Sequence, residues 1–149
     1  MDLLYRFIIY LHVLSAIGSI GPFFILVPTV KKLRVAGDEK LAAYLDIFRF
    51  AVWFSKHSGH VLVGSGILLV LMGPWTWGTP WIIMTLVVMF ASLFFLARAF
   101  SPTLRKFEED GHNKDMLIVK LNRTTWIYII LLSIMLWFMV VKPPLWWAW

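Results

Sequence analysis

Apolar residues gather in four long stretches that are separated by short polar segments. The stretches run approximately from Leu3 to Pro28, Ile47 to Met72, Trp81 to Phe100 and Thr124 to Val141. Each is long enough to cross a hydrocarbon core of about 30 Å, which takes roughly 20 helical residues. Backbone polar groups in lipid must be satisfied within the segment, and alternating strands of about ten residues do not occur, so the stretches predict helices. We therefore expect an all-α bundle of four transmembrane helices.

The composition agrees with a membrane location. Of the 149 residues, 60% are hydrophobic and 15% are charged, against about 45 to 50% and about 25% in a soluble domain. The excess apolar surface must face lipid, and the length allows one domain, residues 1–149. The chain has no cysteine, which excludes disulfide frameworks, thiolate metal sites and cysteine nucleophiles.

Charge divides the connections between the stretches into two kinds. The middle connection, residues 73–80, carries no charge, whereas the first and third connections are basic. By the positive-inside rule the basic connections are cytoplasmic and both termini lie outside. The net charge of +6 is interpreted as a determinant of topology; no motif accompanies it that would indicate nucleic-acid binding. The basic residues are Lys31, Lys32, Arg34, Lys40 and Arg49 in the first connection and Arg105, Lys106, Lys114, Lys120 and Arg123 in the third.

Tryptophans support this orientation, because they are enriched where a membrane protein crosses the interface. Their placement near the middle connection and the C-terminus predicts an aromatic belt on the outer side. The first stretch is interpreted as a retained helix, since it lacks a basic start and a cleavage site of small residues. We expect a multi-pass protein of the bacterial cytoplasmic (inner) membrane. The belt would consist of Trp75, Trp77, Trp81, Trp146, Trp147 and Trp149.

The chain repeats itself at a shift of 74 residues. The segment from Pro28 to Leu33 reappears without a gap as Pro102 to Phe107. This internal repeat predicts two tandem helical hairpins, residues 1–74 and 75–149. Independent convergence of two basic loops is the alternative. With the same shift, Gly37, Lys40 and Arg49 match Gly111, Lys114 and Arg123.

Local signals predict where helices begin. Asp38 follows a glycine and precedes a helix-forming segment, so the second helix is expected to start there, before the bilayer. Asn113 predicts a similar start for the fourth helix. Ser101 followed by Pro102 has the pattern of an N-cap and a proline in the first turn.

Ionisable side chains at membrane depth are confined to the first hairpin. His12, Lys56, His57 and His60 correspond to leucine or isoleucine in the second hairpin under the shift. A charged side chain at that depth costs roughly 2.5 to 3.5 kcal/mol on insertion scales, so these residues call for a physical reason. Lys56 is expected to extend its ammonium towards the cytoplasm.

Depth estimates place two of the histidines near the same level. At 1.5 Å per residue, His12 lies about 14 Å and His60 about 18 Å below the outer ends of their helices. His57 shares a helix face with His60. Small residues next to the histidines predict either close packing of the two helices or room for a flat ligand. They are Ser15, Ala16, Gly18, Ser19 and Gly21 on the first helix and Ser58, Gly59, Gly64, Ser65 and Gly66 on the second.

Four interpretations of the histidines remain open. His12 and His60 could hold a b-type haem as axial ligands, with His57 as the substitute, because imidazole is a common ligand of haem iron. His12, His57 and His60 could bind a transition metal. The histidines and Lys56 could transfer protons or ions, or the histidines could only pack. Met135 and Met139, at i and i+4, are interpreted as packing residues.

Short motifs at both ends of the chain resemble a known family. Leu11 to Ile17 (LHVLSAI), Gly21 to Phe24 (GPFF) and Met139 to Pro143 (MVVKP) look like the opening and closing motifs of a bacterial family of predicted integral membrane proteins whose function is unknown. The resemblance covers the whole chain in span number, loop lengths and ends. It implies a four-span membrane protein.

A more distant resemblance concerns the first-helix histidine. That residue and the four-span plan are similar to the copper-resistance D membrane domain and to the haem-binding membrane protoporphyrinogen oxidase, whose first-helix histidine would fall on His12. The third helix opens Trp81-Ile82-Ile83-Met84 where the oxidase has a Trp-Leu-His-x-Lys-Leu motif. The resemblance therefore implies a haem site and not the porphyrinogen-oxidising activity.

The sequence thus predicts a haem-binding or redox-linked membrane protein. The alternative is a non-enzymatic membrane assembly partner, or a protein that handles a small solute or metal, in which the histidines are structural. The partners expected are the lipid bilayer and either a second copy of the chain or another membrane protein, because four helices bury little interior. No nucleic-acid partner and no catalytic residue is assigned.

Overall fold

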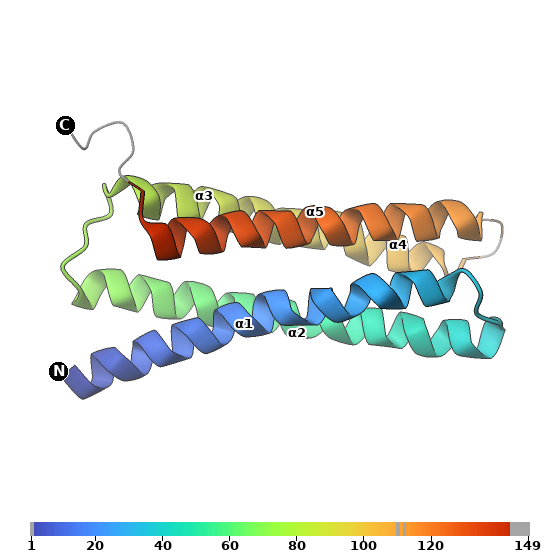
Figure 1. The fold of residues 1–149 in the computed structure, drawn as a ribbon, viewed down its shortest axis with the longest axis horizontal. Coiled ribbons are helices and arrows are strands. Elements are labelled where there is room, and N and C mark those ends of the chain that lie inside the picture. The colour runs from blue at the N-terminus through green and yellow to red at the C-terminus, as the bar shows by residue number, and fades with distance from the viewer. Residues whose placement is uncertain (1, 110, 112, 144–149) are drawn as a thin grey trace.

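The computed structural model describes residues 2–109, 111 and 113–143, and within them it is helical and contains no strand. Three segments follow one another without a break between residues 80 and 106, so the described part of the chain forms four long helices (Figure 1). The elements are α1 (Asp2–Leu33), α2 (Asp38–Met72), α3 (Pro80–Phe95), the π-helical turn η1 (Leu96–Phe100), α4 (Ser101–Lys106) and α5 (Lys114–Val141).

Three of the four helices are long and apolar enough to cross a membrane. They are α1, the continuous segment Pro80–Lys106, and α5. Helix α2 has 35 residues, but Lys56, His57 and His60 lie in its middle, and it is not among the three. The chain is therefore a multi-pass membrane protein, and the passage of α2 through the membrane stays a prediction.

The expected starts of two helices are confirmed. Helix α2 begins at Asp38, after Gly37 in an extended conformation. Helix α5 is capped by Asn113, whose side-chain oxygen accepts a hydrogen bond of 3.0 Å from the backbone N–H of Asp115. Such a bond satisfies one of the N–H groups that a helix start leaves without an intrahelical partner.

The expected N-cap at Ser101 is wrong. The helix does not start there but continues from α3 through η1, and Pro102 lies within the first two positions of α4. A proline inside a helix lacks the backbone N–H, and its ring clashes with the carbonyl four residues earlier. For Pro102 that carbonyl belongs to Arg98, which lies inside η1. The widened π turn therefore lies where both effects have to be accommodated.

The π turn lets one continuous helix run from Pro80 to Lys106 in spite of the proline. Its two ends are anchored in the core, because Leu96 and Phe100 are buried. Arg98 lies between them on the exposed side, with its guanidinium 4.8 Å from the ring centroid of Phe94.

The helices pair as two hairpins, with α1 against α2 and α3 against α5 (Figure 1). The hairpins meet mainly through α1 and α5, whereas α2 and α3 have few contacts with each other. We call the end that holds Asp2 and Val141 the terminal end, and the opposite end the basic-loop end. Thr29 and Thr103, which the 74-residue shift relates, are both buried and both donate a hydrogen bond to the carbonyl four residues earlier. The duplication itself stays a prediction.

The large core side chains lie towards the basic-loop end. Phe23 of α1, Phe100 of η1 and Tyr128 of α5 form an aromatic cluster with ring centroids 4.3 to 6.1 Å apart. Arg49 of α2 pairs with Glu108, which follows α4, and so links the two hairpins at this end. Further fully buried residues here are Leu26, Leu33, Phe48, Ile118 and Leu121.

Helices α1 and α2 approach closely at small residues, as expected. Ser55 donates a hydrogen bond of 2.5 Å to the carbonyl of Ser19, and both residues are buried. A Cβ atom added at Gly18 would lie only 2.7 Å from Oγ of Ser58. In a lipid environment, where helices gain little from hydrophobic association, packing and interhelical hydrogen bonds of this kind hold them together.

Candidate functional site: a cavity at the terminal end

A cavity of about 610 Å³ lies among the helices at the terminal end. Its volume falls within the range of about 300 to 1,000 Å³ that is typical of small-molecule sites. The walls come from α1, α2, α3 and α5 and are mostly apolar. They include Ile20 and Phe24 of α1, Leu62 and Ile67 of α2, Leu86 of α3 and Leu136 of α5.

The cavity extends along much of α1. On α1 the lining residues extend from Tyr5 to Phe24, which is about 28 Å of helix at 1.5 Å per residue. Several lining positions carry small side chains, among them Ala16 and Gly66. The cavity therefore forms a long, partly open apolar space that runs from the terminal end to the level of the aromatic cluster.

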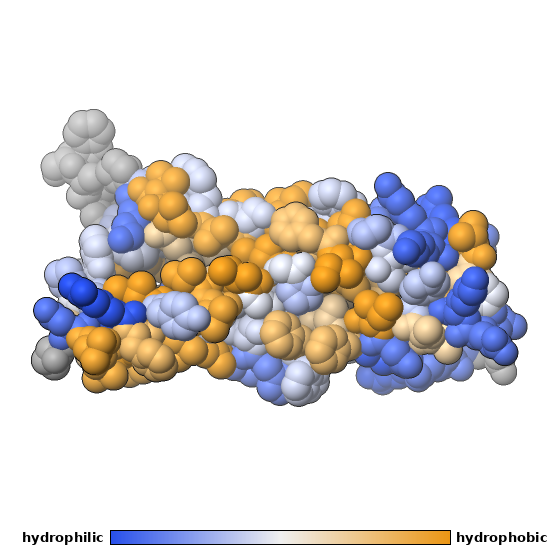
Figure 2. Space-filling model, turned by 60° about the horizontal axis from the view of Figure 1, so that its bottom comes forward, coloured by the Kyte–Doolittle hydropathy of each residue, from blue (hydrophilic) through white to orange (hydrophobic). Residues whose placement is uncertain are grey.

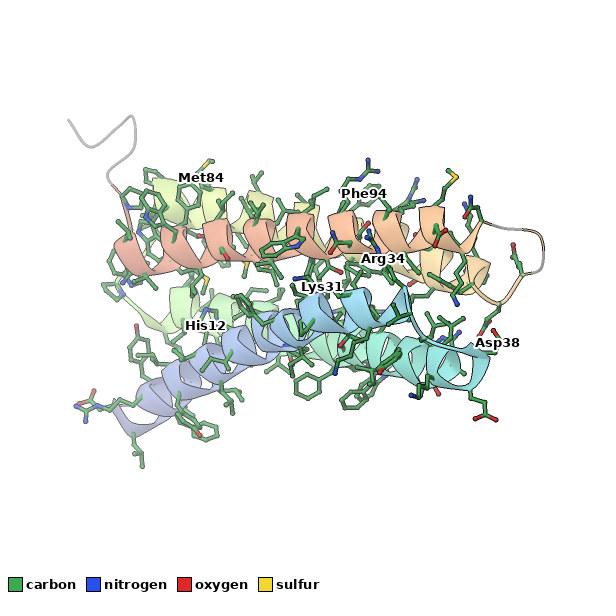
Figure 3. The ribbon with its side chains drawn as sticks, turned by 45° about the vertical axis from the view of Figure 1, so that its right-hand side comes forward. His12, Lys31, Arg34, Asp38, Met84 and Phe94 are labelled. Carbon is green, nitrogen blue, oxygen red and sulfur yellow. The ribbon has the colours of Figure 1, made fainter. Side chains whose placement is uncertain are left out.

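His12 is the histidine in the wall of this cavity. It lies on α1 next to α2 (Figure 3), and its Nδ1 is 2.9 Å from Oγ of Ser65. Gly66 leaves room for the imidazole, because a Cβ atom added there would lie 3.1 Å from Cε1 of His12. A larger residue at position 66 would push the imidazole away from α2.

The hydrogen bonds of Ser65 favour one tautomer of His12. The hydroxyl of Ser65 donates to the carbonyl of Val61 at 2.7 Å. A serine hydroxyl has one hydrogen, so its oxygen is left to accept from the imidazole. With the hydroxyl hydrogen on that carbonyl, Nδ1 of His12 carries the proton and Nε2 keeps an unprotonated lone pair. A bond of this kind to the other ring nitrogen is what orients histidines that ligate metals.

Three methionines also line the cavity. Met89 comes from α3, and Met135 and Met139 come from α5. Met89 and Met135 are buried, so the interpretation of Met135 as a packing residue agrees with its surroundings. Met89 was not distinguished by the sequence, because a methionine in an apolar helix has no pattern that separates a ligand from a core residue.

A lysine and two tryptophans lie at the end of the cavity nearest the chain termini. Nζ of Lys142 is 4.6 Å from the ring centroid of Trp75 and 5.3 Å from that of Trp81. The two indoles meet edge to face with centroids 5.2 Å apart. All three residues line the cavity. Trp146, Trp147 and Trp149 of the expected aromatic belt lie outside the described residues.

His57 and His60 lie elsewhere, on the exposed side of α2. Their rings are 6.2 Å apart between centroids, and neither residue lines the cavity. Nδ1 of His57 donates a hydrogen bond of 2.8 Å to the carbonyl of Trp53. Lys56 is exposed on the same helix. Figure 2 shows a polar zone part-way along the face of α1 and α2, separate from the larger polar surface at the basic-loop end.

The structure thus brings His57 and His60 together and places His12 in a different environment. Among residues 2–109, 111 and 113–143, no group of three or more His, Cys, Asp or Glu side chains is arranged to hold a metal ion. Comparison with protein-family models, with curated proteins and with solved structures finds no match. The chemistry of the cavity itself is therefore the basis for a functional assignment.

Proposed function

We propose that this multi-pass membrane protein binds haem b in the cavity, with Nε2 of His12 as an axial ligand. The observation that carries the proposal is an imidazole in the wall of an apolar cavity of cofactor size, with Nδ1 held beside Ser65. Neutral imidazole is a common ligand of haem iron. Haem supplies one-electron redox chemistry when it is bound.

The residues around His12 fit this group. Ser65 orients the ring through Nδ1, which is the role that a neighbouring acceptor has at ligating histidines. Met89 and Met139 line the same cavity, and a thioether is the second axial ligand in some cytochromes. The sequence-based partner, His60, lies outside the cavity wall, so methionine replaces it in the proposal.

The topology that we propose has four spans with both termini outside, in a bacterial cytoplasmic membrane. Helix α2 is long enough to cross. The exposed ammonium of Lys56 reaches the cytoplasmic interface along its own apolar stem. The terminal end, with Trp75 and Trp81, then lies at the outer interface, where tryptophan is enriched.

Absorption spectroscopy tests the haem proposal. The protein is purified in a neutral detergent, haem is added, and the Soret band is recorded for the wild type and for His12→Ala. We expect a Soret band in the wild type that is lost in His12→Ala. Matched controls are His57→Ala and His60→Ala, which remove exposed imidazoles outside the cavity and should leave the band unchanged. Because free haem absorbs in the same region, unbound haem is first removed by gel filtration, and a wild-type protein fraction without a Soret band overturns the proposal.

The second candidate is an apolar-ligand carrier in which His12 is structural. It is favoured by the mostly apolar walls and by the hydrogen bond that already gives Nδ1 of His12 a partner. In that case the protein binds lipid-like molecules without a Soret band, and His12→Ala lowers stability without removing ligand binding. The same set of variants distinguishes the two candidates.

A further inference from the structure

The cavity has chemically different ends. Towards the middle of the bundle its walls are apolar and include Phe24 and Ile20. At the terminal end it reaches the ammonium of Lys142. The lining of α1 covers about 28 Å of helix, which is long enough for an extended hydrocarbon chain. A space of this shape, apolar along its length and cationic at one end, is complementary to an amphiphile with an acidic head group.

The conformation of Lys142 supports a specific role for its side chain. It is the only residue other than glycine with a positive φ among the described residues, with φ of 49°. Its N–H donates to the carbonyl of Phe138 and closes the last turn of α5. Glycine or asparagine normally occupies this position at a helix end, because other residues adopt the left-handed conformation at a cost. A lysine there holds its ammonium beside two indole rings at the cavity end.

The ammonium of Lys142 can bind an anion. A lysine ammonium has three N–H donors, and Lys142 has no carboxylate partner among the described residues. Trp75 and Trp81 hold the cation by their ring faces, an interaction that leaves N–H groups free to point at a ligand. Their indoles also provide amphipathic surface at the level where a head group would lie.

We infer that the cavity takes an anionic amphiphile, with its carboxylate or phosphate on Lys142 and its apolar part extended towards the middle of the bundle. The inference rests on the cavity of the proposed function being a ligand site, and it does not require the ligand to be haem. Haem b, which carries two carboxylates, belongs to the same class. Long-chain acids and alkyl phosphates share the head-group chemistry.

Quenching of tryptophan fluorescence measures this binding. A brominated stearic acid in the cavity quenches Trp75 and Trp81, and the double variant Trp75→Phe/Trp81→Phe separates this signal from the quenching of exposed tryptophans such as Trp53. The methyl ester has the same chain without the charge. Both are titrated into the protein in neutral detergent at a pH at which the acid is ionised. A charge-assisted hydrogen bond contributes roughly 1.5 to 3 kcal/mol, so we expect the acid to bind at least about tenfold more tightly than the ester.

Variants of Lys142 assign the preference to its charge. Lys142→Asn removes the ammonium and keeps a residue that tolerates the left-handed conformation, so the preference should fall to less than about twofold. Lys142→Arg should retain it. The matched control, Lys32→Asn, removes an exposed cation at the basic-loop end and should leave the preference unchanged. Equal binding of acid and ester by the wild type, or no binding of either, overturns the inference.

Two further measurements separate this inference from the haem proposal. Titration with dodecyl phosphate distinguishes the head groups. If dodecyl phosphate displaces the acid from the wild type but not from Lys142→Asn, the site also binds phosphates. If it does not displace the acid, the site binds carboxylates only. The Soret band is recorded in parallel. A band that depends on His12, together with equal binding of acid and ester, would leave the haem proposal standing and overturn this one. Tighter binding of the acid than of the ester, without a Soret band, would support this inference and overturn the haem proposal.

Discussion

His12 of α1 and Ser65 of α2 are joined by a hydrogen bond of 2.9 Å in the wall of the cavity. The hydroxyl of the serine donates in turn to the carbonyl of Val61. The pair therefore ties the first two helices together, and in the proposed haem site it leaves Nε2 as the nitrogen that binds the ligand. Each effect leads to a measurable consequence.

Ser65→Ala should weaken haem binding while the protein remains folded. The change removes the acceptor that orients the imidazole, and loss of such a partner typically lowers metal affinity by about 10- to 100-fold. Haem titration followed at the Soret band measures it. Ser133→Ala, at an exposed serine of α5, is the control and should bind haem as the wild type does. Unchanged affinity in Ser65→Ala would mean that the bond does not position a ligand.

Gly18→Val should destabilise the first hairpin. A Cβ atom at this position would lie 2.7 Å from Oγ of Ser58 and 3.4 Å from a ring carbon of Phe54, so Ser58 would have to rotate, and the larger valine side chain would press α1 and α2 apart. Overpacking of this kind costs about 1 to 3 kcal/mol in the free energy of unfolding. Gly64→Val introduces the same side chain where no atom lies within 4 Å. Denaturation in mixed micelles should show the loss for Gly18→Val only, and equal losses would contradict the close approach.

The two serines at the α1 and α2 contact should differ in their contribution to stability. Ser55 donates to the carbonyl of Ser19 at 2.5 Å, whereas Ser19 donates in return at 3.5 Å. Hydrogen bonds weaken as they lengthen, and those between membrane helices contribute about 0.6 kcal/mol on average and up to about 1.7. Ser55→Ala should therefore lower the free energy of unfolding by about 1 kcal/mol and Ser19→Ala by clearly less. The reverse order would show that the second bond is the stronger one.

Labelling of single cysteines tests whether α2 crosses the membrane. The chain has no cysteine of its own, and the exposed residues Gly37 and Gly78 lie beyond opposite ends of α2. In intact cells a membrane-impermeant thiol reagent should label Gly78→Cys and should label Gly37→Cys only after permeabilisation. Labelling of both variants in intact cells would contradict the four-span topology with external termini.

The sequence predicts the helices well because their start signals are local. Asp38 and Asn113 act through their own turns of helix, so no knowledge of the remaining fold is needed. The expected helix start at Ser101 and Pro102 is wrong for the opposite reason. Proline can begin a helix or distort one, and only the packing of Phe100 and Leu104 in the core, on either side of it, decides between the two.

The sequence does not predict which side of its helix each histidine occupies. A helix that is apolar all round has no polar stripe to show which side meets its neighbours. Once His12 is seen to meet Ser65, the place of His60 follows from helix geometry: five residues at about 100° each turn it by about 140° from Ser65 around the axis. His12 and His60 can match in depth and still lie on different sides of α2. The cluster of Trp75, Trp81 and Lys142 was only partly foreseen, as part of an interfacial belt.

The sparse contact between α2 and α3 has a consequence for how a ligand arrives. These two helices border the cavity, so in the four-span topology that we propose, a ligand that passes between them comes from the hydrocarbon rather than from water. A hydrophobic molecule partitions strongly into the bilayer, so the concentration that governs occupancy is its mole fraction among the lipids. Uptake by this route needs no aqueous carrier, and the dissociation constant is then expressed as a mole fraction in the lipid and not as an aqueous concentration.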